Sequence, residues 1–556
     1  MLRSGIDKFA SFMRRPRQTV CELSIIRKTP FVAMRIFSGM IACLLSVTPE
    51  FALSATIRIT PTADISESYT DNVRSVSEGA ESDLITQTQV GVNFTADGNR
   101  LNLNLNVGAV HDYYLETDGL NGLRPKALGN GDIELWKDHF FISSSVSMSE
   151  TSTQSDGAQS ATDRSLPTNR TQVLLFDVSP RLVGQMGRML EATLKYSHSE
   201  SIFSNPASGV SAAAPLTATP LTPNPLTNQG GNQKSDDISL SLDTGKYFSR
   251  ISSQLDLEKS TTKSSGQSKQ TDDRIDLVNE YQINRQVALI SRMGYEDTSS
   301  GSGGATNSNL SNSGATGALG VHLKPGPRMD FRTEYGRKYG DPNLSANLSY
   351  KISSFYTLNA SFQQSVTNQN ATRRNQLDRL IVGPDGALVD PFSGSTRDPA
   401  FSNFDLNNGA FRQDLFQMGL SGVFGRNTIN LGADLTSRDS GQPNSKRDEL
   451  GVNLNLSRRL QPRLTGDVGF NFSDTLGSNQ ATTGLAPIAP IINPGVGPGN
   501  LGTSGDQTSY GGNASLSYQM GKALNSSLEY NYLLRKLGAG GDISENTLTL
   551  GIQARF

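Results

Sequence analysis

The chain has few of the residues from which soluble enzymes build a core and a catalytic centre. Only 35% of its 556 residues are hydrophobic, and it contains two cysteines and four histidines. Glycine and proline are frequent instead, at 54 and 24 residues. This composition fits either disorder or a β architecture whose strands are apolar on one face only. The periodicity of the apolar residues therefore decides between the two.

The longest apolar run near the N-terminus predicts export. Arg35 precedes the run 36–47, and Ala52-Leu53-Ser54 resembles a signal-peptidase site, so we expect residues 1–54 to be a Sec-type secretory signal peptide. The run is too short to cross a bilayer as a helix. Met34 opens a signal of conventional length by itself, and this length favours Met34 over Met1 as the true start.

Cysteine and charge exclude several classes of function. Cys21 and Cys43 both lie in the predicted signal, so the mature chain is expected to have no disulfide, thiolate nucleophile or cysteine metal site. The 50 Lys and Arg residues balance 52 Asp and Glu residues, and no basic stripe stands out along the chain. We therefore expect no nucleic-acid partner.

Strict alternation of apolar and polar residues recurs from position 55 to the C-terminus. Leu101, Leu103 and Leu105 alternate with asparagines, and residues 451–457 (GVNLNLS) repeat the pattern. Each such segment has about ten to fifteen residues, the length of a tilted strand that crosses a membrane. The pattern predicts strands with one apolar and one polar face.

The connections between these segments also alternate, between short and long. Short turns are expected at 95–100, 137–139, 183–187, 245–249, 283–286, 324–328, 425–427, 461–463 and 521–523. Long polar stretches lie between them, the largest near 204–236, 368–408 and 476–508. This layout is typical of outer-membrane barrels, with short periplasmic turns and long extracellular loops. We predict an all-β fold: one transmembrane antiparallel up-and-down β-barrel over residues 55–556 with about 22 strands, within a range of about 18 to 24.

Aromatic residues near the short turns predict a girdle at the periplasmic interface of the membrane. Tyrosine and tryptophan favour such interfaces. The candidates are Trp136, Phe140, Tyr247, Phe248, Tyr356 and Tyr518. The alternative interpretation, a core of a soluble β domain, does not explain why the loops are sorted by length.

Two stretches resemble a known family. Residues 59–73 (ITPTADISESYTDNV) and 132–142 (DIELWKDHFFI) are similar to outer-membrane β-barrel proteins associated with PEP-CTERM and exopolysaccharide export systems, within a broader group of barrel porins. The resemblance implies a role in moving or assembling exopolysaccharide, with export-system proteins as partners. It implies no catalytic residues.

The last residues predict a closing strand that carries an assembly signal. The apolar positions Leu548, Leu550, Ile552 and Phe556 alternate with polar ones. Outer-membrane barrels in general end in such a strand with a final Phe, which the barrel-assembly machinery reads. Position 554 is Ala where an aromatic is frequent, so the match is incomplete.

No motif predicts covalent chemistry, a cofactor or a metal. The four histidines are far apart in the sequence, and GxSxG, HExxH and phosphate-loop motifs are absent. We therefore expect no enzyme activity, although an outer-membrane hydrolase remains a third alternative.

The polar positions of the strands are the candidate functional residues, because they would face the barrel lumen. The candidates are Asn102, Asn104, Asn106, Asp256, Glu258, Asp276, Glu280, Arg332, Glu334, Asn453, Asn455, Glu529 and Arg555. They could bind sugar hydroxyls, or they could form inter-strand pairs with a structural role alone. If a lumen of this width is closed, loops such as 204–236 or 368–408 must close it.

These observations lead to two functional hypotheses. The first is a porin-like channel or guide for exopolysaccharide. Its outer surface would contact the lipid of the outer membrane. The second is a structural barrel whose external loops bind polysaccharide without transport.

Overall fold

The computed structural model describes most of the chain from Ala55 onward. The described residues are 55–152, 160–162, 164–165, 170–204, 232–244, 248–264, 269–300, 312–338, 341–368, 371–372, 374–375, 381–382, 388–389, 411–439, 446–477, 507–537 and 541–556. The predicted signal peptide, 1–54, lies outside them and stays a prediction.

Twenty-two antiparallel strands form one sheet. They are β1 (Ala55–Thr70), β2 (Asp83–Gly98), β3 (Leu101–Tyr114), β4 (Gly122–Trp136), β5 (Phe140–Ser152), β6 (Arg170–Met186), β7 (Leu190–Ser204), β8 (Gln233–Asp243), β9 (Ile251–Ser264), β10 (Gln270–Gln282), β11 (Val287–Ser300), β12 (Asn312–Gly326), β13 (Met329–Lys338), β14 (Asp341–Lys351), β15 (Tyr356–Thr367), β18 (Phe411–Phe424), β19 (Asn427–Asp439), β20 (Arg447–Gln461), β21 (Leu464–Gly477), β22 (Gln507–Gln519), β23 (Leu524–Leu537) and β24 (Ile543–Arg555). A short hairpin of β16 (Ile381–Val382) and β17 (Leu388–Val389) lies between β15 and β18, and a 3-10 turn, η1 (Asp118–Leu120), follows β3.

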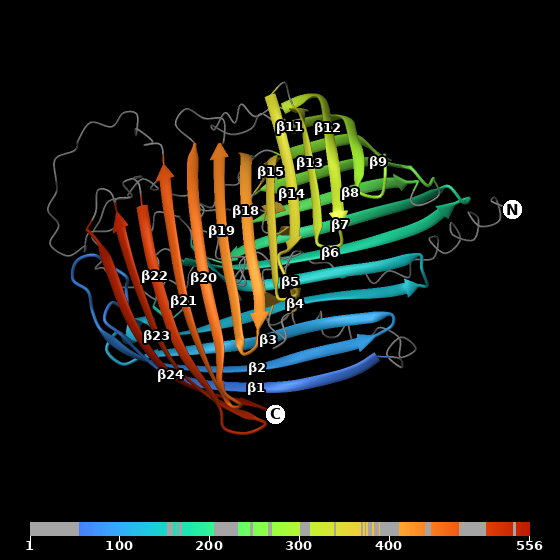
Figure 1. Cartoon of the computed structure of the whole chain (residues 1–556). Coiled ribbons are helices and arrows are strands. Elements are labelled where there is room, and N and C mark those ends of the chain that lie inside the picture. The colour runs from blue at the N-terminus through green and yellow to red at the C-terminus, as the bar shows by residue number, and fades with distance from the viewer. Residues whose placement is uncertain are drawn as a thin grey trace, which may run out of the picture. The chain divides into compact units, whose positions relative to one another are not determined.

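The sheet closes on itself through its first and last strands. β1 pairs with β2 on one side and with β24 on the other, with Thr62 opposite Arg555 and Thr70 opposite Thr547. Each remaining strand pairs with its neighbours in the sequence around the wall, as Figure 1 shows. The backbone N–H of Phe556 also donates to the carbonyl of Pro61 at 3.0 Å. The predicted closed barrel of 22 strands is confirmed.

Alternation along each strand gives the wall two different faces. Directly paired residues share a face, so the pairs Leu105–Phe94 and Asn106–Asn93 separate an apolar face from a polar one. Many large apolar side chains on the first face are exposed, including Leu319 at 71% and Met293 at 64%. A closed barrel with an exposed apolar exterior satisfies its backbone hydrogen bonds internally and can lie in hydrocarbon. The described residues contain no helix that is long and apolar enough to cross a membrane.

Two segments with weak alternation, 131–135 and 345–350, both lie within strands, β4 and β14. In each case the segment is hydrogen-bonded to the strands on both sides. This pairing makes it a strand although the pattern of its own sequence is weak.

The short turns lie at the edge of the barrel that also holds the ends Ala55 and Phe556. Two turn positions adopt the left-handed backbone that glycine tolerates best: Gly187 with φ 73° and Gly425 with φ 60°. Several strand boundaries differ from the predicted turns; for example, β6 continues to Met186 through most of the predicted 183–187 turn. Similarly, β8 starts at Gln233, inside the predicted 204–236 loop. In both places the partner strand β7 extends the pairing beyond the alternating stretch.

Adjacent residues on the two faces of β3 give a test of the wall. Arg in place of Leu105 would put a charge among lipid tails, which costs about 2–4 kcal/mol near the bilayer midplane. Arg in place of Asn106, one residue further on, would point into the lumen. We expect Leu105→Arg to lower the free energy of unfolding in liposomes by that amount and Asn106→Arg to lower it much less. Equal losses for both variants would contradict the assignment of faces.

Candidate functional site: the barrel interior

The polar face of the strands meets in the barrel interior and includes all the predicted lumen-lining residues. Asn102, Asn104 and Asn106 share the inner face of β3, and Asn453 and Asn455 share that of β20. Asp256 and Glu258 of β9 pair with inner-face residues of β10, Glu529 of β23 pairs with Thr549, and Arg555 pairs with Thr62. The roles of these residues stay predictions.

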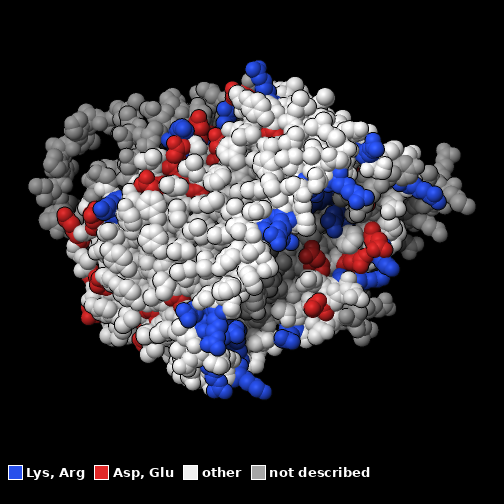
Figure 2. Space-filling model, in the orientation of Figure 1, with Lys and Arg blue, Asp and Glu red and all other residues white. Residues whose placement is uncertain are grey.

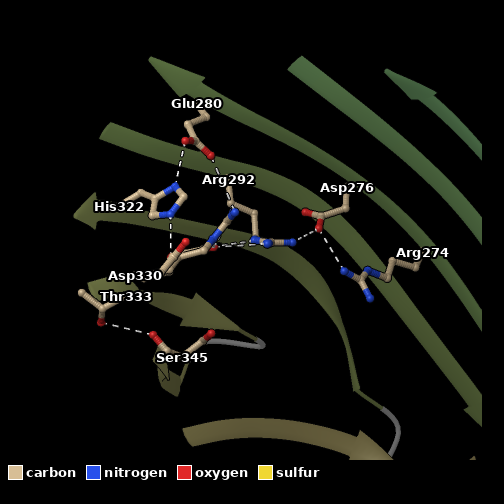
Figure 3. Close-up of polar contacts among 10 residues, drawn as sticks. Arg274, Asp276, Glu280, Arg292, His322, Asp330, Thr333 and Ser345 are labelled. Atoms are coloured by element: carbon tan, nitrogen blue, oxygen red, sulfur yellow. Dashed lines mark hydrogen bonds and ion pairs between the residues drawn. The ribbon is translucent and has the colours of Figure 1, made fainter. Parts of the chain in front are cut away.

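The inner face of β10 to β13 carries a network of paired charges, drawn in Figure 3. Arg292 of β11 lies at its centre. Its guanidinium forms ion pairs with Asp276 of β10 and with Glu334 of β13, the second at 2.8 Å. Both carboxylates are almost inaccessible, with 4% and 7% of the side chain exposed. Buried carboxylates need such partners because an unpaired charge is costly to remove from water.

Two arms extend the network along the wall. On one side, Arg274 bonds Asp276 at 2.9 Å and lies 3.5 Å from Glu296, which also pairs with Lys338 at 2.9 Å. On the other side, Arg332 bonds Glu334 at 2.9 Å. Cations and anions thus alternate across the four strands β10 to β13. This alternation offsets the repulsion that the close pair Asp256–Asp276 would otherwise cause.

His322 ends the second arm near the inner turns. Its two ring nitrogens lie 2.9 Å from carboxylate oxygens of Glu280 and Asp330. Lys324 lies 3.2 Å from Asp330, and Arg332 lies 3.7 Å from Glu280. No group of three His, Cys, Asp or Glu side chains among the described residues is arranged to hold a metal ion.

A glycine gives this network its space. A Cβ at Gly294 would lie 2.9 Å from Oδ1 of Asp276 and 2.5 Å from the carbonyl oxygen of Ile275. The side chain of Asp276 can therefore lean over the neighbouring strand only because position 294 carries no side chain.

The opposite wall has a smaller buried cluster. Arg124 of β4 pairs with Asp112 of β3 and with Glu150 of β5, at 2.5 and 3.0 Å. Gln87 of β2 donates to Asp112 at 2.7 Å. Asp112 is 1% exposed, so the outer part of this wall also relies on charges that neutralise one another.

A segment between β5 and β6 folds into the barrel and contacts the seam between the first and last strands. The carboxylate of Glu545, at the outer end of β24, accepts hydrogen bonds from the hydroxyls of Ser75 and Ser165 and from the amide of Ala161. Arg164 donates to Ser66 of β1 at 3.3 Å. The described residues of this segment, 160–162 and 164–165, therefore lie against the inner surface of the outer half of the barrel.

A second segment folds inward from the β15–β18 connection. Asn368 donates to Thr262 of β9 at 3.4 Å, and Arg374 pairs with Asp237 of β8. The connection 368–408 was expected to be able to close the lumen, and two of its described residues, Asn368 and Arg374, do reach the inner face. The rest of that loop and most of 204–236 lie outside the described residues.

Exposure changes along the inner face from one end of the barrel to the other. On β3, Asn102 and Asn106 near the inner turn are exposed, whereas Asp112 and Tyr114 near the outer end are almost fully buried. The hydroxyl of Tyr114 donates to the carbonyl of Arg164 at 2.5 Å. The outer half of this wall is covered, and its inner half is accessible.

The predicted girdle residues lie on the outward face or in the turns at the inner edge. Trp136 and Phe248 are exposed, at 61% and 48%, and Tyr518 is 42% exposed. Phe140 is paired with Trp136, and Tyr356 begins β15. Tyr247 lies outside the described residues.

Sequence reasoning missed the ion-pair network and the inward segment 160–165. The network had a signal, since arginines and carboxylates alternate at inner-face positions of β10, β11 and β13. The inward segment had none, because its contacts join residues hundreds of positions apart, such as Ser165 and Glu545. His198, in contrast, pairs with Asp236 at 2.7 Å beside Tyr196, which is on the outward face.

Fold and interior together define a class: the chain is a 22-stranded outer-membrane β-barrel of the Gram-negative envelope. No protein-family model matches the chain, and no curated protein matches it. Solved structures that are similar include the ferric-catecholate import receptor Fiu from E. coli K12, the FrpB iron transporter from Neisseria meningitidis and the siderophore receptor PirA from Acinetobacter baumannii.

These three likenesses are distant. The identities are 10%, 10% and 9%, and the TM-scores are 0.45, 0.46 and 0.45. They cover 89%, 89% and 90% of this chain and 81%, 82% and 81% of those chains. Similarity at this level does not specify what this chain transports or binds.

Arg292 provides a test of the charge network. Replacing it by Met leaves Asp276 with Arg274 and Glu334 with Arg332 as their remaining cations, and losing hydrogen bonds to charged groups typically costs about 1.5–3 kcal/mol. Lys259→Met is a matched control, because Lys259 pairs with Asp273 at 2.8 Å where both side chains are about half exposed and such pairs contribute about 0–1 kcal/mol. Denaturant unfolding of the reconstituted barrel measures both. A loss below about 1 kcal/mol for Arg292→Met would show that lumen water solvates the carboxylates.

Proposed function

We propose that this barrel is an outer-membrane channel or guide for a polysaccharide, and that it serves exopolysaccharide export of the PEP-CTERM-associated type. One observation carries the proposal: the inner face of the wall is largely polar, and along β3 it is accessible near the inner turn and covered near the outer end. An interior of this kind offers a polymer hydrogen-bonding groups along its path and a gate at the outer end. The resemblance of residues 59–73 and 132–142 to export-associated barrels supplies the polymer class.

Amide side chains give the inner half its chemistry. Asn453 of β20 faces Asn471 of β21, and Asn455 faces Asn430 of β19. Asn513 of β22 lies opposite Asn531 of β23 in the same way. Amides both donate and accept hydrogen bonds, as sugar hydroxyls do, and they carry no net charge that would trap a polymer. The inner half can therefore contact sugar without holding it tightly.

The inward segment 160–165 is suited to be the gate. Its polar contacts are hydrogen bonds from Ala161 and Ser165 to the Glu545 carboxylate, from the Arg164 guanidinium to Ser66, and from the hydroxyl of Tyr114 to a backbone carbonyl of the segment. Such contacts can be exchanged for water at small net cost, about 0.5–1.5 kcal/mol each for the neutral pairs. The segment can leave the wall while the barrel itself stays closed, because strand pairing does not depend on it.

Bilayer conductance tests the channel and its gate together. We expect wild-type barrel to conduct in planar bilayers in short openings, and soluble exopolysaccharide to reduce the current. Glu545→Ala removes the shared acceptor of Ser75, Ala161 and Ser165, so its open time should rise severalfold. Glu67→Ala is the control, because Glu67 of β1 accepts a bond from Thr86 of β2 on the outward face of the wall.

The conductance of a variant is compared with wild type only if the variant runs as a folded, heat-modifiable band on gel electrophoresis. If neither wild type nor Glu545→Ala conducts, transport is excluded and the covered outer half favours the second function, a scaffold that binds polysaccharide. Removal of the external loops should then release polymer from cells and leave secretion intact. If Glu67→Ala opens the pore as much as Glu545→Ala, the segment is not the gate.

We also propose that the barrel-assembly machinery recognises the outward face of β24. Leu548, Leu550 and Ile552 are 50%, 58% and 41% exposed on this face, and Phe556 follows them at 76%. Phe556→Ser keeps the backbone bond to Pro61 and removes only the aromatic ring. We expect a several-fold lower yield of heat-modifiable barrel in the outer membrane, with Arg555→Ala as the inner-face control. A normal yield for Phe556→Ser would exclude the signal.

A further inference from the structure

Five cations gather at three neighbouring inner turns of the wall formed by β18 to β23. We call them the basic patch: Arg426, Arg458, Arg459, Arg463 and Lys522. All five are exposed. Figure 2 shows Lys and Arg collected at the lower edge of this wall, below an expanse without charge.

The basic patch has no acidic residue in its own turns. Residues 423–428, 458–465 and 519–524 contain no Asp or Glu. Within the described part of the chain, the ion pairs do not include any of the five cations. This sets the patch apart from the interior, where arginines are paired with carboxylates. Unpaired cations on one edge favour an anionic partner from outside the chain.

The patch lies against the apolar band of the wall. Arg458 pairs with Asn427 of β19 and Gly466 of β21 on the outward face. Its neighbours on that face, Leu456 and Leu460, are 40% and 43% exposed. Tyr518 and Phe424, both exposed, lie on adjoining strands at the same edge. A cation between exposed apolar side chains at the end of a membrane-facing strand is placed at the depth of lipid headgroups.

We propose that the basic patch binds the phosphates of anionic phospholipids in the periplasmic leaflet. The side chain of Arg458 starts on the outer surface of the wall, so a polymer inside the lumen does not reach it. Its apolar neighbours match acyl chains, and its charge matches a phosphate with net negative charge. The patch thus holds a lipid of one charge class beside the turns and fixes the depth of this wall in the membrane. The proposal is independent of what passes through the lumen.

Native mass spectrometry of the full-length barrel tests this binding. The barrel is released from micelles that contain equal amounts of dioleoyl phosphatidylglycerol and dioleoyl phosphatidylcholine, and the retained lipids are counted. Each cation near an anionic surface gives about a fivefold preference. We expect wild type to retain phosphatidylglycerol, and the triple variant Arg458→Gln, Arg463→Gln, Lys522→Gln to lower the ratio of the two lipids by at least about tenfold.

A control triple variant removes the same charge elsewhere. Lys234→Gln, Lys259→Gln and Lys446→Gln change exposed cations at or toward the outer end of β8, β9 and β20, and we expect the lipid ratio to stay within about twofold. Heat modifiability reports folding in each case. If the patch triple does not fold, Arg458→Gln alone should lower the ratio by about fivefold.

Three outcomes would overturn the proposal. The first is equal retention of both lipids by wild type. The second is an equal fall for both triple variants, which would be an effect of net charge only. The third is loss of binding to soluble polygalacturonate, but not to phosphatidylglycerol, in the patch triple, which would make the patch a surface for an acidic polymer.

Discussion

Closure of the sheet between β1 and β24 is the constraint on which the whole molecule depends. In hydrocarbon an unpaired backbone N–H or C=O has no water to bond, so a sheet can cross a membrane only if it has no edge. The register that joins Thr62 to Arg555 and Thr70 to Thr547 removes both edges at once. It also places the start of β1 and the end of β24 at the same rim, which requires an even number of strands. Twenty-two satisfies this requirement, and the short turns and long connections then follow on opposite rims.

A wall this long encloses more space than side chains can fill, and the chain handles its two halves differently. Barrels of 16–18 strands already leave an aqueous channel. In the outer half, residues 160–162, 164–165 and Arg374 contact the inner face, and carboxylates beneath them are bonded to arginines, serines and backbone amides. In the inner half, amides remain in contact with water. The paired charges of β10 to β13 connect these halves and hold four strands in register without any apolar core.

The sequence was sufficient for the features that depend on period two. Leu101, Leu103 and Leu105 against their asparagines specify a strand and its two faces, and the sorting of connections by length specifies the barrel and its strand number. Contacts that follow no period could not be predicted. Ser165 donates a hydrogen bond to Glu545, which lies 380 positions further along the chain. Arg292 pairs with Asp276 and Glu334 because the register of the strands places them beside it. The bulges after Leu323 and Arg459 likewise depend on the partner strand.

Arginine plays two opposite roles in this barrel, and the surroundings decide between them. Inside, Arg292 and Arg124 are held between carboxylates, so their charge is neutralised and they brace the wall. At the inner rim, Arg458 has uncharged neighbours on its own face, among them Leu456, Leu460 and Asn427, so its charge is available to the membrane. The two environments explain the two roles. The internal ion pairs link neighbouring strands that face the water-filled lumen, and the rim cations bind lipid headgroups and so hold the wall at their depth. The same residue type therefore braces the wall from inside and, at Arg458, faces the membrane from outside.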